Sequence, residues 1–157
     1  MKTLVIYDSY FGNTEKVAQK IHSSLGENAT IKKAEDFTQK DLEGINILIV
    51  GSPTRGFNYS ERIKPLLGKI PENSLAGIKV ASFDTRIDEQ TVKPRILKFL
   101  MSTFGYAAEK IQKTLEKKGG EKIIEPMGFV VKDSEGPLQE NELEKAEIWA
   151  TKIKEAL

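Results

Sequence analysis

Cysteine is absent from the 157 residues of the chain, and histidine occurs once. The first absence excludes disulfides, thiolate metal sites and iron–sulfur ligation by this chain. The second argues against the usual zinc sites, which need several imidazole or thiolate ligands, and we expect no metal site. The sequence also has no apolar run long enough to span a bilayer and no charged-then-apolar leader, so we expect a cytoplasmic protein that does not bind membranes.

Charge of neither sign dominates, because 24 Lys and Arg residues face 23 Asp and Glu residues, for a net charge of +1. Such a balance creates no basic field that would attract nucleic acid. The composition, 39% hydrophobic and 30% charged, is that of an ordinary globular protein. From the length we expect residues 1–157 to form a single domain, and a monomer is the simplest assembly.

Hydrophobic periodicity along the chain predicts strands that alternate with helices. We expect strands at 3–8, 29–33, 45–50, 78–83 and 123–131, the last one interrupted near Pro126. We expect helices at 13–25, 60–70, 94–117, with a possible break near Gly105, and 140–157. This alternation is typical of the α/β class, with a doubly wound parallel sheet of five strands and right-handed crossovers.

The loop after the first strand has the composition of a phosphate site. Its residues are Ser9, Tyr10, Phe11, Gly12, Asn13 and Thr14, and a helical pattern follows at once. At such a junction, free backbone N–H groups and the positive end of the helix dipole face an anion, and short hydroxyl side chains complete its hydrogen bonds. The loop is no G-x-G-x-x-G motif and lacks the lysine of a G-x-x-x-x-G-K-[ST] motif. It therefore favours a mononucleotide over NAD or ATP, with the phosphate bound without a cation or metal.

Residues 5–21 resemble the signature of the flavodoxin family. The matching positions are Val5, Ile6, Tyr7, Ser9, Gly12, Thr14, Ala18 and Ile21. The resemblance implies non-covalent FMN and the strand order 2-1-3-4-5, with the ligand beyond the carboxyl ends of strands one and three; flavodoxin is itself the standard example of this geometry. Phe11 departs from the pattern, because many flavodoxins carry a hydroxyl residue there, so its contribution is limited to the backbone N–H.

The loop after the third strand is rich in hydroxyl, glycine and aromatic residues. It reads Ser52, Pro53, Thr54, Arg55, Gly56, Phe57, Asn58 and Tyr59. Its aromatic rings could pack on a flat heterocycle, with a stacking contribution of about 1 kcal/mol. The resemblance implies that the loop flanks the isoalloxazine ring and that the Gly56–Phe57 peptide can turn its carbonyl toward flavin N5, which the φ freedom of glycine permits. The alternative is a surface turn with exposed aromatics.

The loop after the fourth strand contains Asp84, Thr85 and Arg86. In flavodoxins this loop often places a tyrosine on the ring, but here no aromatic follows the strand before Phe99, so the resemblance leaves this wall to Thr85 and backbone, or leaves it open. Phe83 is expected in the core.

Arg55 and Arg86 could raise the potential of the second reduction step, because fully reduced flavin is an anion. At about 5 Å and an effective dielectric constant near 20, a guanidinium would stabilise that anion by roughly 3 kcal/mol. Alternatively, both arginines are solvated or pair with Asp84 and Asp88. Among the other polar and aromatic residues, Asp8 is expected to cap its turn, Trp149 to lie in the core and residues 134–138 to form an ordinary connection.

These features lead to a first hypothesis, an FMN-binding electron carrier that shuttles single electrons between redox partner proteins and has no catalytic residues of its own. The second is an FMN-dependent NAD(P)H:quinone oxidoreductase, because Pro53-Thr54-Arg55 resembles the corresponding loop of those enzymes. No insertion that would build a substrate site is visible in the sequence. A third possibility is a flavodoxin-like fold that has lost FMN and acts as a binding module. A phosphoreceiver domain is rejected, because the third strand ends in Gly51-Ser52 and offers no phosphoacceptor aspartate.

Overall fold

The computed structural model describes residues 1–88 and 94–157 of the chain. The strands are β1 (Thr3–Tyr7), β2 (Ala29–Lys33), β3 (Ile47–Pro53), β4 (Lys79–Ile87), β5 (Glu121–Lys122) and β6 (Met127–Val131). The helices are α1 (Asn13–Leu25), α2 (Ile63–Lys69), α3 (Arg95–Phe104), α4 (Ala107–Lys117) and α5 (Glu142–Glu155), with short 3₁₀ turns at Ala34–Asp36 and Gln39–Leu42. None of the described helices is both long and apolar enough to cross a bilayer.

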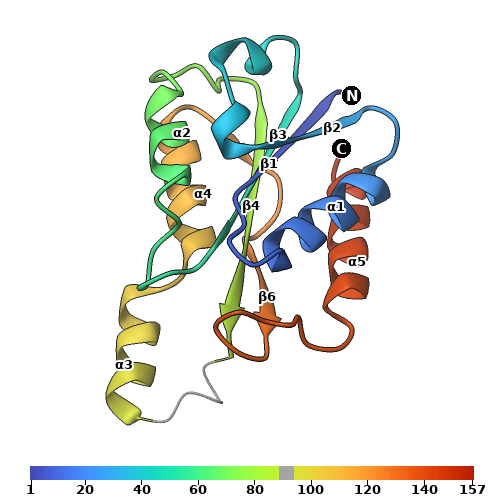
Figure 1. Ribbon diagram of the computed structural model, residues 1–157. Helices are drawn as coiled ribbons and strands as arrows, with labels where there is room; N and C mark the ends of the chain where they lie inside the picture. The colour runs from blue at the N-terminus through green and yellow to red at the C-terminus, as the bar shows by residue number, and fades with distance from the viewer. Residues whose placement is uncertain (89–93) are drawn as a thin grey trace.

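All strand pairs of the sheet are parallel, and the order is β2-β1-β3-β4-β5 (Figure 1). This confirms the doubly wound α/β fold and the strand order expected from the resemblance. The interrupted fifth strand is two segments, which pair with different parts of β4: β5 with its start and β6 with its end. Pro126 lies between them, where it interrupts no ladder, since proline has no N–H to donate.

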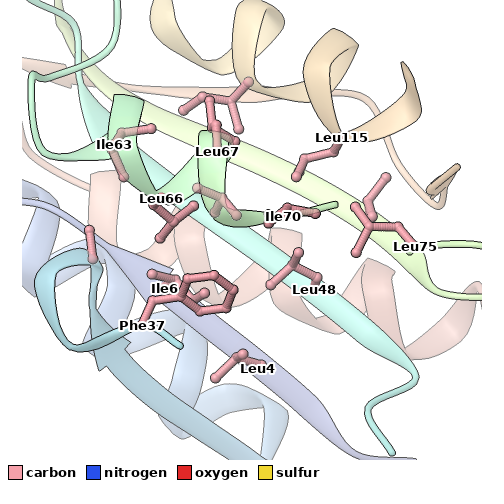
Figure 2. Packing of buried hydrophobic residues seen from close by; sticks show 14 of the residues in the cluster. Leu4, Ile6, Phe37, Leu48, Ile63, Leu66, Leu67, Ile70, Leu75 and Leu115 are labelled. Carbon is pink, nitrogen blue, oxygen red and sulfur yellow. The ribbon is translucent and has the colours of Figure 1, made fainter. Parts of the chain in front are cut away.

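Helices cover both faces of the sheet, with α2 and α4 on one face and α1 and α5 on the other (Figure 1). Successive side chains of a strand point to opposite faces, and β1 accordingly sends Leu4 and Ile6 to one core and Val5 and Tyr7 to the other. Figure 2 shows the first core, in which Leu4, Ile6 and Leu48 from the sheet pack against leucines and isoleucines of α2 and α4.

The second core is centred on three aromatic rings from β4, β6 and α5. Phe83, Phe129 and Trp149 meet edge to face, with ring centroids 6.0 to 6.4 Å apart, a favoured geometry for aromatic pairs. All three side chains are buried, which confirms the core positions expected for Phe83 and Trp149.

Several boundaries differ from those expected. β4 runs four residues past Phe83 to Ile87, because it pairs with β3 as far as Thr85 and with β6 as far as Ile87. The helix expected at 60–70 is shorter and spans Ile63–Lys69; a turn precedes it, in which the Ile63 N–H donates to the Ser60 carbonyl at 3.1 Å. Pro65 lies in the first turn of α2, where a backbone N–H has no intrahelical acceptor, so it removes no helical hydrogen bond.

The stretch expected as one long helix at 94–117 is two helices. Gly105 separates α3 from α4 with a φ of +71°, a conformation that glycine adopts without steric cost. α4 lies against the sheet, whereas α3 extends below α4, beside the carboxyl ends of the strands (Figure 1). The break near Gly105 is thus confirmed, and it divides a buried helix from an exposed one.

Candidate functional site

A cavity of about 320 Å³ lies where the carboxyl ends of β1, β3 and β4 meet, the place at which open α/β sheets bind ligands. Its lining residues come from the loops after these strands and after β6: Ser9, Tyr10, Phe11, Asn13, Thr14, Pro53, Thr54, Arg55, Gly56, Thr85, Arg86, Ile87, Val131 and Ser134. Three loops expected at the site are therefore brought together, and a fourth joins them.

The first loop presents the start of α1 to the cavity. Gly12 ends the loop with a φ of +86°, and its N–H donates to the Ser9 hydroxyl at 3.0 Å. Asn13 and Thr14 follow and are buried. Because N–H groups in the first turn of a helix have no intrahelical acceptor, this turn offers donors and a positive dipole end to an anion. The arrangement suits a phosphate group.

Hydroxyl groups connect the three loops to one another. The Thr14 and Thr85 hydroxyl oxygens lie 2.8 Å apart, so loops one and three are hydrogen-bonded. The Thr54 N–H donates to the Thr85 carbonyl at 2.9 Å, while the Thr54 hydroxyl accepts the Ala107 N–H at 3.0 Å. Thr54 thus ties loop two both to loop three and to the start of α4.

The second loop forms a tight turn. Arg55 and Asn58 exchange two backbone hydrogen bonds, of 2.8 and 3.0 Å, and the two residues between them, Gly56 and Phe57, have φ angles of +53° and +63°. Positive φ at both central residues is characteristic of a type I′ turn. For Phe57 this is the left-handed conformation that side chains with a Cβ disfavour.

The aromatic side chains of this loop do not line the cavity. Phe57 packs against Phe104, with ring centroids 6.0 Å apart, and Tyr59 is partly buried against the first core. The rings that do line the cavity, Tyr10 and Phe11, belong to the first loop. In this structure the second-loop rings therefore contact other parts of the protein, and their packing on a heterocycle stays a prediction.

Arg86 is held by an acidic pair. Its guanidinium makes two hydrogen bonds to the fully buried Asp84 carboxylate, at 2.7 and 2.8 Å, and one to Glu109 at 3.3 Å. It also lies over the Tyr106 ring, 3.7 Å from the centroid. Burial raises the pKa of the Asp84 carboxyl, and the charge and hydrogen bonds of Arg86 oppose that rise. Arg86 therefore pairs with Asp84, as the second of the two expectations for this residue stated. Its positive charge at the cavity is balanced by the Asp84 carboxylate.

Close packing against Gly128 completes this arrangement. Gly128 is paired with Asp84 across the ladder between β4 and β6. A Cβ at this position would lie only 2.2 Å from Arg86 Nε and 2.4 Å from Cζ. The guanidinium therefore occupies the space that any side chain at position 128 would need.

Arg55 differs from Arg86 in exposure and surroundings. Its guanidinium lies over the Tyr10 and Phe11 rings, 5.4 and 5.6 Å from their centroids, within the range of cation–π attraction. The side chain is exposed at the mouth of the cavity. Of the two arginines, Arg55 is thus the one held by rings and not by carboxylates.

Eleven of the residues predicted for the site line the cavity, and the other five do not. Gly12 shapes the loop, Ser52 is buried and accepts the Ser60 N–H, and Asp84 holds Arg86. Phe57 and Asn58 form the second half of the tight turn.

Three lining residues were missed, namely Ile87, Val131 and Ser134. The loop at 134–138, interpreted as an ordinary connection, reaches α1: the Asn13 side chain donates to the Glu135 carbonyl at 2.9 Å. The only sequence signal was its position after the last strand, next to the third loop in a parallel sheet.

Asp8 does not cap the turn as expected. It is buried, and one carboxylate oxygen accepts a hydrogen bond from Arg62 at 3.1 Å. Nearby, the Tyr7 hydroxyl donates to Glu15 at 2.8 Å. Burial, together with this carboxylate, raises the pKa of Tyr7 to about 12, so the phenol stays neutral beside the first loop.

Comparison with known proteins gives consistent results. The family model described as Flavodoxin matches residues 5–149. The structure is similar to oxidised flavodoxin 2 from Bacillus cereus, with 23% identity, a TM-score of 0.77 and both chains covered completely. It is also similar to two-electron reduced Megasphaera elsdenii flavodoxin, with 19% identity, a TM-score of 0.67, and 96% of this chain and 98% of that chain covered.

A further similarity is to part of a longer protein, the rubredoxin oxygen:oxidoreductase of Desulfovibrio gigas. There the identity is 18% and the TM-score 0.71, and the match covers 99% of this chain but 35% of that chain. No curated protein matches the chain at a significant level.

Proposed function

Because the chain belongs to the flavodoxin family of electron-transfer proteins, whose members bind FMN, we propose that it carries single electrons between redox partner enzymes. FMN supplies the redox chemistry when bound, and the protein's part is to bind it, orient it and tune its electrostatics. The partner enzymes would approach the open side of the cavity.

The residues of the cavity fit this cofactor. The first turn of α1, with Ser9, Asn13 and Thr14, provides the N–H and hydroxyl donors that a phosphate ester needs. The remaining lining combines the Tyr10 and Phe11 rings and the aliphatic Ile87 and Val131, which can pack on a flat heterocycle, with hydroxyl groups and two guanidinium groups, which can bind its polar edge. We propose that the predicted residues in these loops hold FMN.

One observation favours a carrier over a quinone reductase: among the described residues, those that line the cavity include no carboxylate, imidazole or amine side chain. The polar side chains of this lining are hydroxyl groups, the Asn13 amide and two guanidinium groups. A two-electron enzyme that reduces a quinone also delivers protons and gains from a positioned acid. Electron transfer through an exposed cofactor edge needs no such group.

Titration with FMN, followed by stepwise reduction, tests the proposal. We expect quenching of FMN fluorescence at one site per chain and two well-separated one-electron potentials. Overlapping potentials together with steady oxidation of NADH or NADPH by a quinone would establish the enzyme instead. Failure to bind FMN at all would leave the chain as a flavodoxin-like binding module.

Arg55 allows a test of electrostatic tuning. We expect Arg55→Gln to make the second reduction step more negative by about 40 mV, which corresponds to roughly 1 kcal/mol, the Coulomb energy of unit charges about 5 Å apart near the dielectric constant of water. We use the dielectric constant of water because the Arg55 side chain is exposed, so that solvent screens its charge. Arg55→Lys is the matched control, since it keeps the charge and should keep the potential; equal potentials in all three proteins would refute the role of this charge.

We further propose that residues 1–157 act as one domain, as a monomer and in the cytoplasm. The complete mutual coverage with a flavodoxin of the same size supports the single domain. Sedimentation of the FMN-loaded protein would test the monomer, and fractionation of the producing cells would test the location.

A further inference from the structure

Helix α3 carries an apolar face that nothing in the described part of the chain covers well. Its side chains retain much of their exposure: 74% for Ile96, 66% for Phe99, 54% for Phe104 and 38% for Leu97. At helical spacing, Ile96, Phe99 and Leu100 share one face, with Leu97 and Phe104 at its edge. A helix of ten residues is marginal in water without packing, so this face calls for a partner surface.

The helix lies beside the mouth of the cavity. It follows β4, whose last residue, Ile87, lines the cavity. Its last residue, Phe104, contacts Phe57 in the second loop, with ring centroids 6.0 Å apart. In Figure 1, α3 extends past the carboxyl ends of β4 and β6, away from the helices that cover the sheet. Whatever covers α3 would therefore lie next to the open edge of the cofactor site.

Charge on this segment has one sign, unlike charge on the whole chain. From Pro94 to Ala108 the charged residues are Arg95 and Lys98, and there is no acidic residue. At helical spacing Arg95 flanks the apolar face beside Phe99, whereas Lys98 lies on the opposite side of the helix with Ser102. The complementary surface is an apolar groove with a rim of Asp and Glu, the kind of surface that accepts basic amphipathic helices.

We propose that α3 is the docking helix for the redox partner, and that it inserts its apolar face into an acid-rimmed groove of that protein. This inference rests on the proposed function, because it needs a partner that exchanges electrons with FMN. It adds a definite surface and a definite partner chemistry, in which Ile96 and Phe99 anchor the contact and Arg95 and Lys98 guide it.

Two other occupants fit less well. A second copy that paired through its own α3 would bring two more cations and no anion to the contact, so this symmetric pairing would lack complementary charge. A lipid surface generally requires a cluster of roughly four to eight Lys and Arg residues, and the described helix has two.

Photo-cross-linking of the FMN-loaded protein tests the proposal. The photoreactive residue p-benzoylphenylalanine replaces Phe99, and in the matched control it replaces Ile148, an exposed apolar residue of α5 on the far side of the sheet. Both proteins are irradiated in an extract of the producing cells, and cross-linked peptides are identified by mass spectrometry. Fluorescence titration with FMN on the same samples reports the proposed function separately.

The expected result has three parts. Position 99, but not position 148, cross-links to an Asp- and Glu-rich segment of one protein. Charge reversal in Arg95→Glu/Lys98→Glu abolishes the cross-link while FMN binding stays unchanged. The captured protein, once purified, changes the redox state of the bound FMN, at a rate about tenfold lower in the charge-reversed variant.

Any other cross-linking pattern overturns the proposal. A cross-link to a second copy, to lipid, or to the chain's own cofactor site would assign the face to that occupant. Equal capture at positions 99 and 148, or none, would show that the face selects no partner. If FMN fails to bind, the proposed function falls by that measurement alone.

Discussion

Helices α3 and α4 follow one another along the chain, and both have apolar residues at helical spacing, but only α4 buries them. Ala107, Ala108, Ile111 and Leu115 of α4 are fully buried against the sheet, whereas the large apolar side chains of α3 remain exposed. The start of α4 is also held from outside, because Thr54 accepts the Ala107 N–H and Asp84 accepts the Ala108 N–H at 2.8 Å. Periodicity thus predicts a helix and its apolar face, but it does not reveal what the face will pack against.

The largest effect is expected where α4 is held by charge. Asp84→Asn should lower the free energy of unfolding by about 3 to 5 kcal/mol, because it leaves the buried Arg86 without its main counter-ion. Arg95→Gln in α3 is the matched control and should change stability by less than about 0.5 kcal/mol. Urea unfolding followed by circular dichroism measures both, and a loss below about 1 kcal/mol for Asp84→Asn would show that the ion pair does not anchor α4.

The next prediction compares the buried apolar face of α4 with the exposed apolar face of α3. Ile111→Ala in α4 should cost about 2 to 4 kcal/mol, the usual range for a buried aliphatic side chain reduced to alanine. Ile96→Ala in α3 makes the same chemical change at an exposed position, and we expect it to cost under about 0.5 kcal/mol. Equal losses in urea unfolding would mean that α3 packs in solution as tightly as α4 does.

A smaller effect is expected at the bond between the cavity and α4. Thr54→Val keeps the shape but removes the oxygen that accepts the Ala107 N–H, so unfolding should become easier by about 1 kcal/mol. In α3, the Thr103 hydroxyl donates to the carbonyl of Phe99 one turn earlier in the same helix, and Thr103→Val should leave stability nearly unchanged. Thermal unfolding of the FMN-free proteins compares the two, and similar shifts would remove the anchoring role of Thr54.

The smallest effect concerns the residue between the helices. Gly105→Ala places a Cβ at a φ of +71° and should cost about 1 kcal/mol or slightly less, although open space surrounds the position. The helical signal in circular dichroism should stay constant, because the two helices remain separate. A gain in helicity together with a gain in stability would show that α3 can continue into α4.

Much of this fold is predictable from the sequence because its signals are local. α1 and β2 have the predicted bounds, since Gly12 and Gly26 flank a helix with a regular apolar face. β4 is longer than predicted because its last residues are ordered by pairing with β3 and β6, and neither partner is visible in the local pattern.

The residues of the site also differ in how far local sequence predicts them. The strand-loop-helix chemistry of the first loop identifies it from the residues themselves, but Ser134 reaches the cavity only through the packing of the β6 loop on α1. The pairing of Asp84 with Arg86 was open to inference, because residues two apart in a strand share a face. The positions of Phe57 and Tyr59 were not, since each turns away from the cavity toward a partner that is distant in sequence.

The contact between Gly128 and Arg86 links the substitutions that the two positions tolerate. A side chain at position 128 would displace the Arg86 guanidinium from its place, and the buried Asp84 carboxylate would then lose both hydrogen bonds to it. Among related chains, positions 84, 86 and 128 should therefore vary together, so that the aspartate, the arginine and the glycine are either all present or all replaced. Transplanting the third loop into another protein of this fold would succeed only if the glycine on the neighbouring strand travelled with it.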